Sequence, residues 1–133
     1  MQSTAASILS IDHIGIRVTN AEVSRAFYAK FGFCETEYFA DDQANEMETP
    51  SGVRINLIMN GVKRTNNILL DEPIKHPGIT HLAFVVEDLN ALQTWLQANK
   101  IVITEGPKQF SPRRITLFIR DPDGNVLEFN QLI

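Results

Sequence analysis

The sequence predicts an α+β protein made of two tandem βαβββ modules, whose curved mixed sheets surround a shared cavity. Two repeated features predict this fold class. A β-rich run with a histidine at its third place occurs at residues 11–18 and again, 68 residues later, at 79–86. A Pro-x-Gly turn occurs at residues 50–52 and again, 72 residues later, at 122–124. The chain therefore contains the same order of elements twice.

The repeat sets the expected domain organisation. We predict a first module over residues 8–60, a connector over 61–78 and a second module over 79–133, which together form one compact domain. The length of 133 residues is sufficient for one domain or for two small, closely packed halves.

The first module is expected to begin with the strand that carries His13. Asn20 is a candidate N-cap for the helix that follows, and Val23, Phe27 and Phe31 give that helix an apolar stripe. The predicted elements are a strand over 9–18, a helix over 21–31 and strands over 33–39, 43–49 and 53–59.

The second module repeats this order after the strand that carries His81. Asp88 is its candidate N-cap, and the helix stripe contains Leu89, Leu92, Trp95 and Leu96. The predicted elements are a strand over 79–86, a helix over 89–98 and strands over 101–104, 113–120 and 125–131. The change of offset from 68 to 72 requires four extra residues, which we assign to a loop at 105–110.

Composition limits the classes of function. Hydrophobic residues make up 44% and charged residues 21%, as in an ordinary globular protein. The formal charge of −4 and the lack of a basic stripe argue against nucleic acid as the main partner. The single cysteine, Cys34, excludes an intrachain disulfide and a multi-cysteine metal cluster. No signal peptide or membrane-spanning run is visible, so we expect a cytoplasmic protein with no membrane partner.

Strand alternation brings four polar residues to the helix-free faces of the two sheets. His13 and His81 occupy equivalent places in the repeat, and so do Asn56 and Glu128. Two imidazoles and one carboxylate suit Fe, Mn, Ni, Co or Zn, with positions left open for a substrate. A single histidine on a strand is more often simply hydrogen-bonded, but the joint pattern favours metal. Asn56 is a candidate fourth ligand.

Four segments resemble the vicinal oxygen chelate superfamily, which includes glyoxalases, extradiol dioxygenases, fosfomycin-resistance enzymes and bleomycin-resistance proteins. The segments are residues 11–16, 26–33, 80–84 and 121–128. The resemblance implies that a divalent metal is the cofactor and that His13, His81 and Glu128 bind it. It also implies a homodimer in which the halves of two chains complete each other's cavities.

The resemblance leaves the reaction open. Glyoxalase I enzymes carry a glutamate where this chain has Asn56, and an amide cannot accept a proton usefully near neutral pH. We therefore expect a metal-dependent enzyme acting on a small oxygen-bearing substrate, as lyase or isomerase, dioxygenase or transferase. The alternative is a protein that binds and sequesters a drug without catalysis, as the bleomycin-resistance branch does. A third option is an incidental metal site in a structural or regulatory protein.

Charged residues on the predicted cavity faces are candidate substrate contacts. Arg17 and Arg54 share strand faces with His13 and Asn56 and could hold a carboxylate or phosphate. The alternative for both is an arginine that reaches solvent. Glu46 and Arg120 are further candidates.

Overall fold

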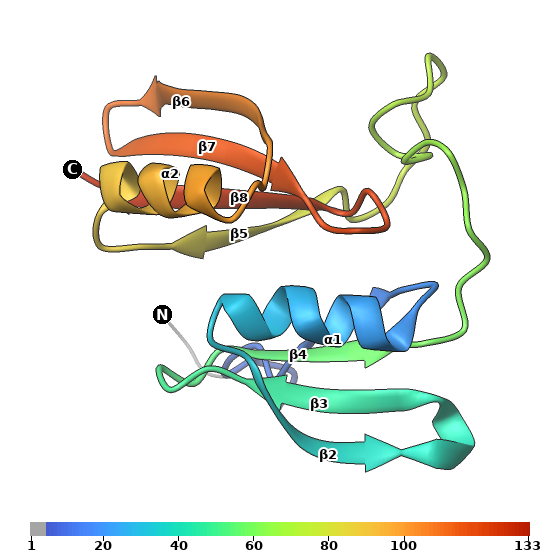
Figure 1. Ribbon diagram of the computed structural model, residues 1–133. Helices are drawn as coiled ribbons and strands as arrows, with labels where there is room; N and C mark the ends of the chain where they lie inside the picture. The colour runs from blue at the N-terminus through green and yellow to red at the C-terminus, as the bar shows by residue number, and fades with distance from the viewer. Residues whose placement is uncertain (1–4) are drawn as a thin grey trace. The chain divides into compact units, whose positions relative to one another are not determined.

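The computed structural model describes residues 5–133 and divides into two compact units. The first unit ends at Val62 and the second spans Lys63–Ile133. Each unit contains one long helix and one four-stranded sheet in the order βαβββ, which confirms the predicted α+β class (Figure 1). Over the described residues, every helix is too short or too polar to cross a membrane.

The first unit has the strand order β1-β4-β3-β2. Strand β1 pairs in parallel with β4, and the remaining pairs are antiparallel. The predicted cap is confirmed, because the Asn20 side chain accepts a hydrogen bond from the Val23 amide. The elements are β1 (Ile14–Arg17), α1 (Ala21–Lys30), β2 (Cys34–Phe39), a 3-10 turn (Ala40–Asp42), β3 (Ala44–Glu48) and β4 (Arg54–Ile58).

The second unit has the equivalent order β5-β8-β7-β6, with β5 parallel to β8. Asp88 caps its helix as predicted by accepting a hydrogen bond from the Ala91 amide. The elements are β5 (His81–Val85), α2 (Leu89–Ala98), β6 (Ile103–Ser111), β7 (Arg114–Arg120) and β8 (Val126–Leu132).

Strand register confirms the repeat at both offsets. Gly15 pairs with Asn56 in the first unit, and Ala83 pairs with Glu128 in the second. Between the next two strands, Ala44 pairs with Ile58 and Thr116 pairs with Asn130. Asn56 and Glu128 therefore occupy equivalent places on their sheets, and so do Ile58 and Asn130.

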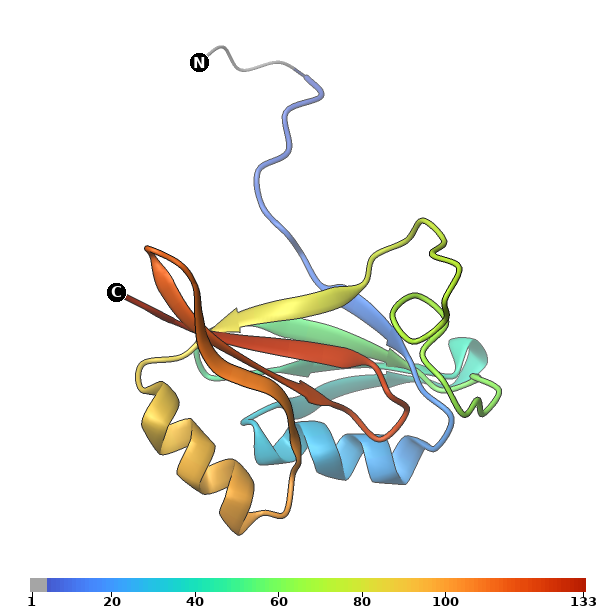
Figure 2. The ribbon, with the colours of Figure 1, turned by 90° about the horizontal axis from the view of Figure 1, so that it is seen from above.

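Each helix covers one face of its own sheet (Figures 1 and 2). The side chains of Ile55, Leu57, Leu127 and Phe129 are all buried. Burial of these side chains removes most of their apolar surface from water, which stabilises each by roughly 1.5–3 kcal/mol. Strand alternation then places Asn56 and Glu128 on the opposite, helix-free faces.

The inner stripe of α1 differs from the prediction. Val23 is 49% exposed, whereas Ser24 and Tyr28 are buried. Residues four apart lie on one helix face, and the Tyr28 ring packs edge-on against Phe27 and Phe33. The large ring therefore sets the orientation of the helix, and the small Ser24 is buried on the same face.

Two element boundaries also differ from the prediction. Strand β1 begins at Ile14 rather than at residue 9, so His13 immediately precedes it. The predicted loop at 105–110 is part of β6, which pairs with β7 through three register shifts. Because β6 is the edge strand, its extra residues can bulge outward without breaking a second ladder. A side chain at Gly106, where φ is +83°, would collide with the Thr116 carbonyl.

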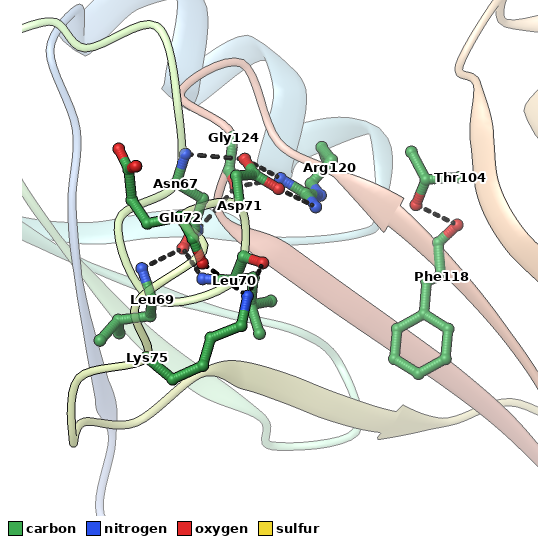
Figure 3. A network of polar contacts seen from close by, with 10 residues as sticks. All are labelled: Asn67, Leu69, Leu70, Asp71, Glu72, Lys75, Thr104, Phe118, Arg120 and Gly124. Carbon is green, nitrogen blue, oxygen red and sulfur yellow. Dashed lines mark hydrogen bonds and ion pairs between the residues drawn. The ribbon is translucent and has the colours of Figure 1, made fainter.

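The connector folds against the turn between β7 and β8 (Figure 3). Asp71 and Arg120 form a two-point ion pair in which both nitrogen–oxygen distances are 3.0 Å. The Asn67 amide donates to the Gly124 carbonyl at 2.9 Å. The hydrogen bonds from Arg120 and from the Asn67 backbone lower the pKa of Asp71 to about 2. These contacts attach the connector to the second unit.

Candidate metal centre

Two of the predicted ligands, His81 and Glu128, lie close together in the second unit. His81 is the first residue of β5, and Glu128 lies in the neighbouring parallel strand β8. Their Nε2 and Oε1 atoms are 3.2 Å apart. The Glu128 side chain is only 11% exposed, whereas that of His81 is 36% exposed. The pair therefore combines a sheltered carboxylate with an imidazole that a ligand can reach.

A hydrogen-bonded chain fixes the Glu128 carboxylate. The Asn130 amide donates to Glu128 Oε2 at 2.8 Å, and the Thr116 hydroxyl donates to Asn130 Oδ1 at 2.6 Å. All three residues are buried. Because Oε2 is held by Asn130, Oε1 is the oxygen directed at His81. Outer contacts of this kind orient the ligands of metal sites.

Both predicted histidine ligands have their Nδ1 atom held by the preceding residue. Thr80 Oγ1 lies 2.8 Å from His81 Nδ1, and Asp12 Oδ2 lies 2.7 Å from His13 Nδ1. The hydrogen bond with His13 lowers the pKa of Asp12, which favours a carboxylate in that contact. In each histidine, Nε2 is therefore the nitrogen that can bind an ion. The same arrangement at equivalent repeat positions matches the outer contacts of metal-binding imidazoles.

The separation of His81 and Glu128 fits two ligands of one ion. With these two atoms 3.2 Å apart, both would be near enough to hold one ion, and imidazole nitrogen and carboxylate oxygen suit a divalent first-row metal. Among residues 5–133, no group of three or more His, Cys, Asp or Glu side chains is close enough to hold an ion. His81 and Glu128 thus supply two donors, and His13 belongs to the first unit.

Asn56 presents an amide oxygen that the fold leaves unsatisfied. Its Oδ1 atom is buried and has no hydrogen-bond partner among residues 5–133. The reason lies in its neighbours, because the first unit has Ala44 and Ile58 where the second has Thr116 and Asn130. Neither apolar side chain can donate a hydrogen bond. A buried, unpaired acceptor is costly unless a ligand completes it, which fits a role toward a cation or a substrate hydroxyl.

The four substrate-contact candidates are all engaged with other side chains or lie beside them. Arg17 donates to Asn60 at 3.0 Å, and Arg54 forms ion pairs with Glu48 and with Asp12. Glu46 lies with Glu48 and Arg54 along a hollow of about 310 Å³ on the first unit. Arg120 is held by Asp71 (Figure 3). Each arginine would exchange an existing contact for one with a substrate.

Sequence reasoning did not identify the residues that support Glu128. Thr116 and Asn130 are buried polar residues on strands β7 and β8, and Phe118 pairs with Glu128 across the same ladder. One signal was present in the sequence, because Asn130 shares strand parity with Glu128. Thr116 and Phe118 share parity on the adjacent strand, but their pairing with β8 depends on register.

Comparisons with solved structures show the same fold. A glyoxalase/dioxygenase from Nostoc punctiforme is 21% identical, with a TM-score of 0.73 and coverage of 98% of this chain and 99% of that one. A glyoxylase/bleomycin resistance protein/dioxygenase domain from Frankia sp. EAN1pec is 26% identical, with a TM-score of 0.76 and coverage of 96% and 94%. An integron cassette protein from V. Cholerae is 22% identical, with a TM-score of 0.71 and coverage of 96% and 98%.

Comparison of the sequence with curated proteins gives no significant match. The sequence does match the family described as the glyoxalase/bleomycin resistance protein/dioxygenase superfamily, over residues 10–129. The match includes both histidine-bearing segments and the turn before Glu128. The chain therefore belongs to the glyoxalase/bleomycin resistance protein/dioxygenase superfamily.

Proposed function

We propose that this protein is a divalent-metal-dependent enzyme that acts on a small oxygen-bearing substrate. The observation that carries the proposal is the contact between His81 Nε2 and Glu128 Oε1, 3.2 Å apart and supported by Asn130. An ion pair with a purely structural role would not need hydrogen bonds that fix the outer atom of each side chain. Here the other oxygen of the carboxylate and the other nitrogen of the imidazole are both held, so one donor atom of each residue is presented to the same point.

His81 and Glu128 would hold the ion, and hydrogen bonds to both side chains would keep their donor atoms in place. When bound, the ion supplies Lewis acidity toward substrate oxygens. Thr116 and Asn130 keep Glu128 in one orientation, and Thr80 keeps the His81 ring in place. His13 as third ligand and Asn56 as fourth remain predictions from the repeat.

Asn56 limits the chemistry that the site can perform. Its amide can accept a hydrogen bond from a substrate hydroxyl or coordinate a cation, but it cannot take up a proton near neutral pH. A reaction that needs a base at this position, as in glyoxalase I, is therefore disfavoured. We infer a reaction in which the substrate is polarised and held, as lyase, isomerase, dioxygenase or transferase.

Metal analysis of the purified protein tests the proposal. We expect one equivalent of Fe, Mn, Ni, Co or Zn in the wild-type protein and none in His81→Ala or Glu128→Gln. His76→Ala is the matched control, because His76 is exposed in the connector and should not affect the ion content. A wild-type protein that binds none of these ions tightly would overturn the proposal.

The same measurement decides whether His13 is a ligand. We expect His13→Ala to lower ion affinity as strongly as His81→Ala, because the two imidazoles have equivalent supporting contacts. Asp12→Ala should produce a smaller loss, since it removes only the contact to Nδ1. Unchanged affinity in His13→Ala would exclude it from the ligand set.

The second candidate function is sequestration of a small aromatic compound without catalysis. The observation that favours it is a set of aromatic rings beside His81, formed by Phe118 and the partly exposed Phe110. A metal ion that stays tightly bound through purification would favour the enzyme. A protein that is purified without metal but binds aromatic compounds would favour sequestration.

Homodimer formation and a cytoplasmic location remain predictions from the sequence and the family. Light scattering coupled to gel filtration tests the first, with a mass of twice the 15.0 kDa chain as the expected result. A monomer at micromolar concentration would contradict it.

A further inference from the structure

A row of aromatic rings leads away from His81 along the outer part of the second sheet. The His81 and Phe118 rings meet edge to face, with centroids 6.0 Å apart. Phe118 and Phe110 meet in the same way at 5.9 Å. Edge-to-face contacts hold rings in defined orientations and leave ring faces free for a further partner.

Register places Phe118 on the face that carries the metal pair. Phe118 pairs with Glu128 across the β7–β8 ladder, so both side chains leave the same, helix-free face of the sheet. The neighbours Leu117 and Ile119 are fully buried on the opposite face. Phe118 therefore borders Glu128 directly, and Phe110 is 43% exposed at the outer end of the row.

A positive charge stands at the outer end of the row. Lys108 Nζ lies 4.6 Å from the centroid of the Phe110 ring. Such a contact keeps the ammonium group over the ring, where it can still form an ion pair. The same face also carries Glu105 of β6, which pairs with Phe118 of β7. An anionic group would therefore be attracted to Lys108 and repelled at Glu105, which fixes its position along the row.

We propose that Phe118, Phe110 and Lys108 form the substrate-recognition surface, and that the substrate is a small aromatic compound with an anionic group. The ring of the substrate packs on Phe118 and Phe110, its anionic group meets Lys108, and its oxygens at the other end reach the His81–Glu128 pair. This assignment rests on the proposed function, which makes that pair the reacting end.

The repeat indicates that the recognition surface is specific to the second unit. Register places Glu46 of the first unit at the position that Phe118 occupies in the second, because Glu48 pairs with Arg54 as Arg120 pairs with Val126. The first unit thus carries a carboxylate where the second carries a ring.

Amide NMR of the metal-free full-length protein tests the proposal with phenylphosphonate as the probe. We expect saturable shifts at Phe110 and Phe118, with weaker binding of methylphosphonate, which lacks the ring, and of benzamide, which lacks the charge. Phe110→Ala should weaken phenylphosphonate binding by roughly 3- to 10-fold, the loss expected for one aromatic contact. Lys108→Gln should weaken it by roughly 2- to 5-fold and reduce its salt dependence.

Matched controls separate the surface from general effects. Val102→Ala removes an exposed apolar side chain of the same unit, and Lys63→Gln removes an exposed charge, so neither should change binding. Equal binding of methylphosphonate and phenylphosphonate, or equal effects of Lys63→Gln and Lys108→Gln, would overturn the proposal.

Manganese binding by calorimetry distinguishes this proposal from the proposed function. Phe110→Ala should bind Mn²⁺ like the wild type, whereas Glu128→Gln should lose Mn²⁺ but still bind phenylphosphonate. A wild-type protein that binds phenylphosphonate at these rings but not Mn²⁺ would refute the metal enzyme and leave the aromatic surface standing. A protein that binds Mn²⁺ without phenylphosphonate shifts would refute the surface alone.

Discussion

Replacing Thr116 with valine tests whether the buried chain behind Glu128 positions a metal ligand. The substitution preserves shape but removes the hydroxyl that donates to Asn130 Oδ1 at 2.6 Å. Thr116 is 1% exposed and Asn130 is 5% exposed, so water cannot easily replace the lost donor. An unsatisfied buried acceptor costs about 1–3 kcal/mol, and the added buried methyl group offsets about 0.8 kcal/mol. We expect the free energy of unfolding to fall by about 0.2–2 kcal/mol.

The effect on ion binding should exceed what lost stability explains. Without the Thr116 hydroxyl, the Asn130 side chain keeps only the contacts of its nitrogen, to Glu128 Oε2 and to the Phe84 carbonyl, so it holds Glu128 less firmly. Loss of such an outer contact weakens ion affinity by about 10- to 100-fold. The assays are urea unfolding of the metal-free protein and calorimetric titration with Mn²⁺, both performed on the full chain.

Thr116→Ser is the matched control for this prediction. Serine retains the hydroxyl and loses one buried methyl group, which costs about 1 kcal/mol. The two variants should therefore be similarly destabilised, but only Thr116→Val should lose ion affinity. If both variants bound Mn²⁺ equally well, or lost it to the same extent, the positioning role of the buried chain would be refuted.

Three further substitutions test the fold around the site. Asp71→Asn should remove the stability that the ion pair with Arg120 provides. The pKa of Asp71 is lowered from 3.8 to about 2, so this contribution is present above pH 3.8 and is lost as pH falls toward 2. The urea midpoints of wild type and variant should converge over that range; a constant gap would contradict the prediction. Asn45→Ala leaves the buried Leu57 amide without its acceptor, and we expect a loss of about 2–3 kcal/mol in urea unfolding, with a loss below about 0.5 kcal/mol as the contrary result. Asn20→Ala removes the α1 cap and should cost about 1 kcal/mol, seen as faster amide exchange confined to the start of that helix.

The repeat and the strand faces could be predicted because both depend on local rules. The period of two in a strand places Glu128 and Leu127 on opposite faces whatever the rest of the chain does. The N-caps at Asn20 and Asp88 depend only on the next three residues. These rules were sufficient to identify the residues of the His81–Glu128 pair as candidate ligands.

The support of Glu128 and the shape of β6 could not be predicted, since both depend on strand pairing. The hydrogen bond between the Thr116 and Asn130 side chains forms only in one register of β7 against β8. The extra residues of β6 could form either a loop or bulges, and the sequence composition suits both. The wrong assignment of Val23 to the inner face arose because Ser24 is small enough to be buried while its type predicts exposure.

The unpaired oxygen of Asn56 reflects a chemical difference between the two units. The two units share one backbone arrangement but surround these positions differently. Glu128 in the second unit has side-chain donors that stabilise a negative charge, whereas Asn56 in the first unit has apolar neighbours that do not. An acidic residue at position 56 would lack the supporting donors that Glu128 receives, because Ala44 and Ile58 offer none. A carboxylate at this position would therefore depend on a bound cation to balance its charge, whereas Glu128 also has the support of Asn130 and Thr116. Only the second unit therefore has, at this place on its sheet, side-chain donors that support a negative charge.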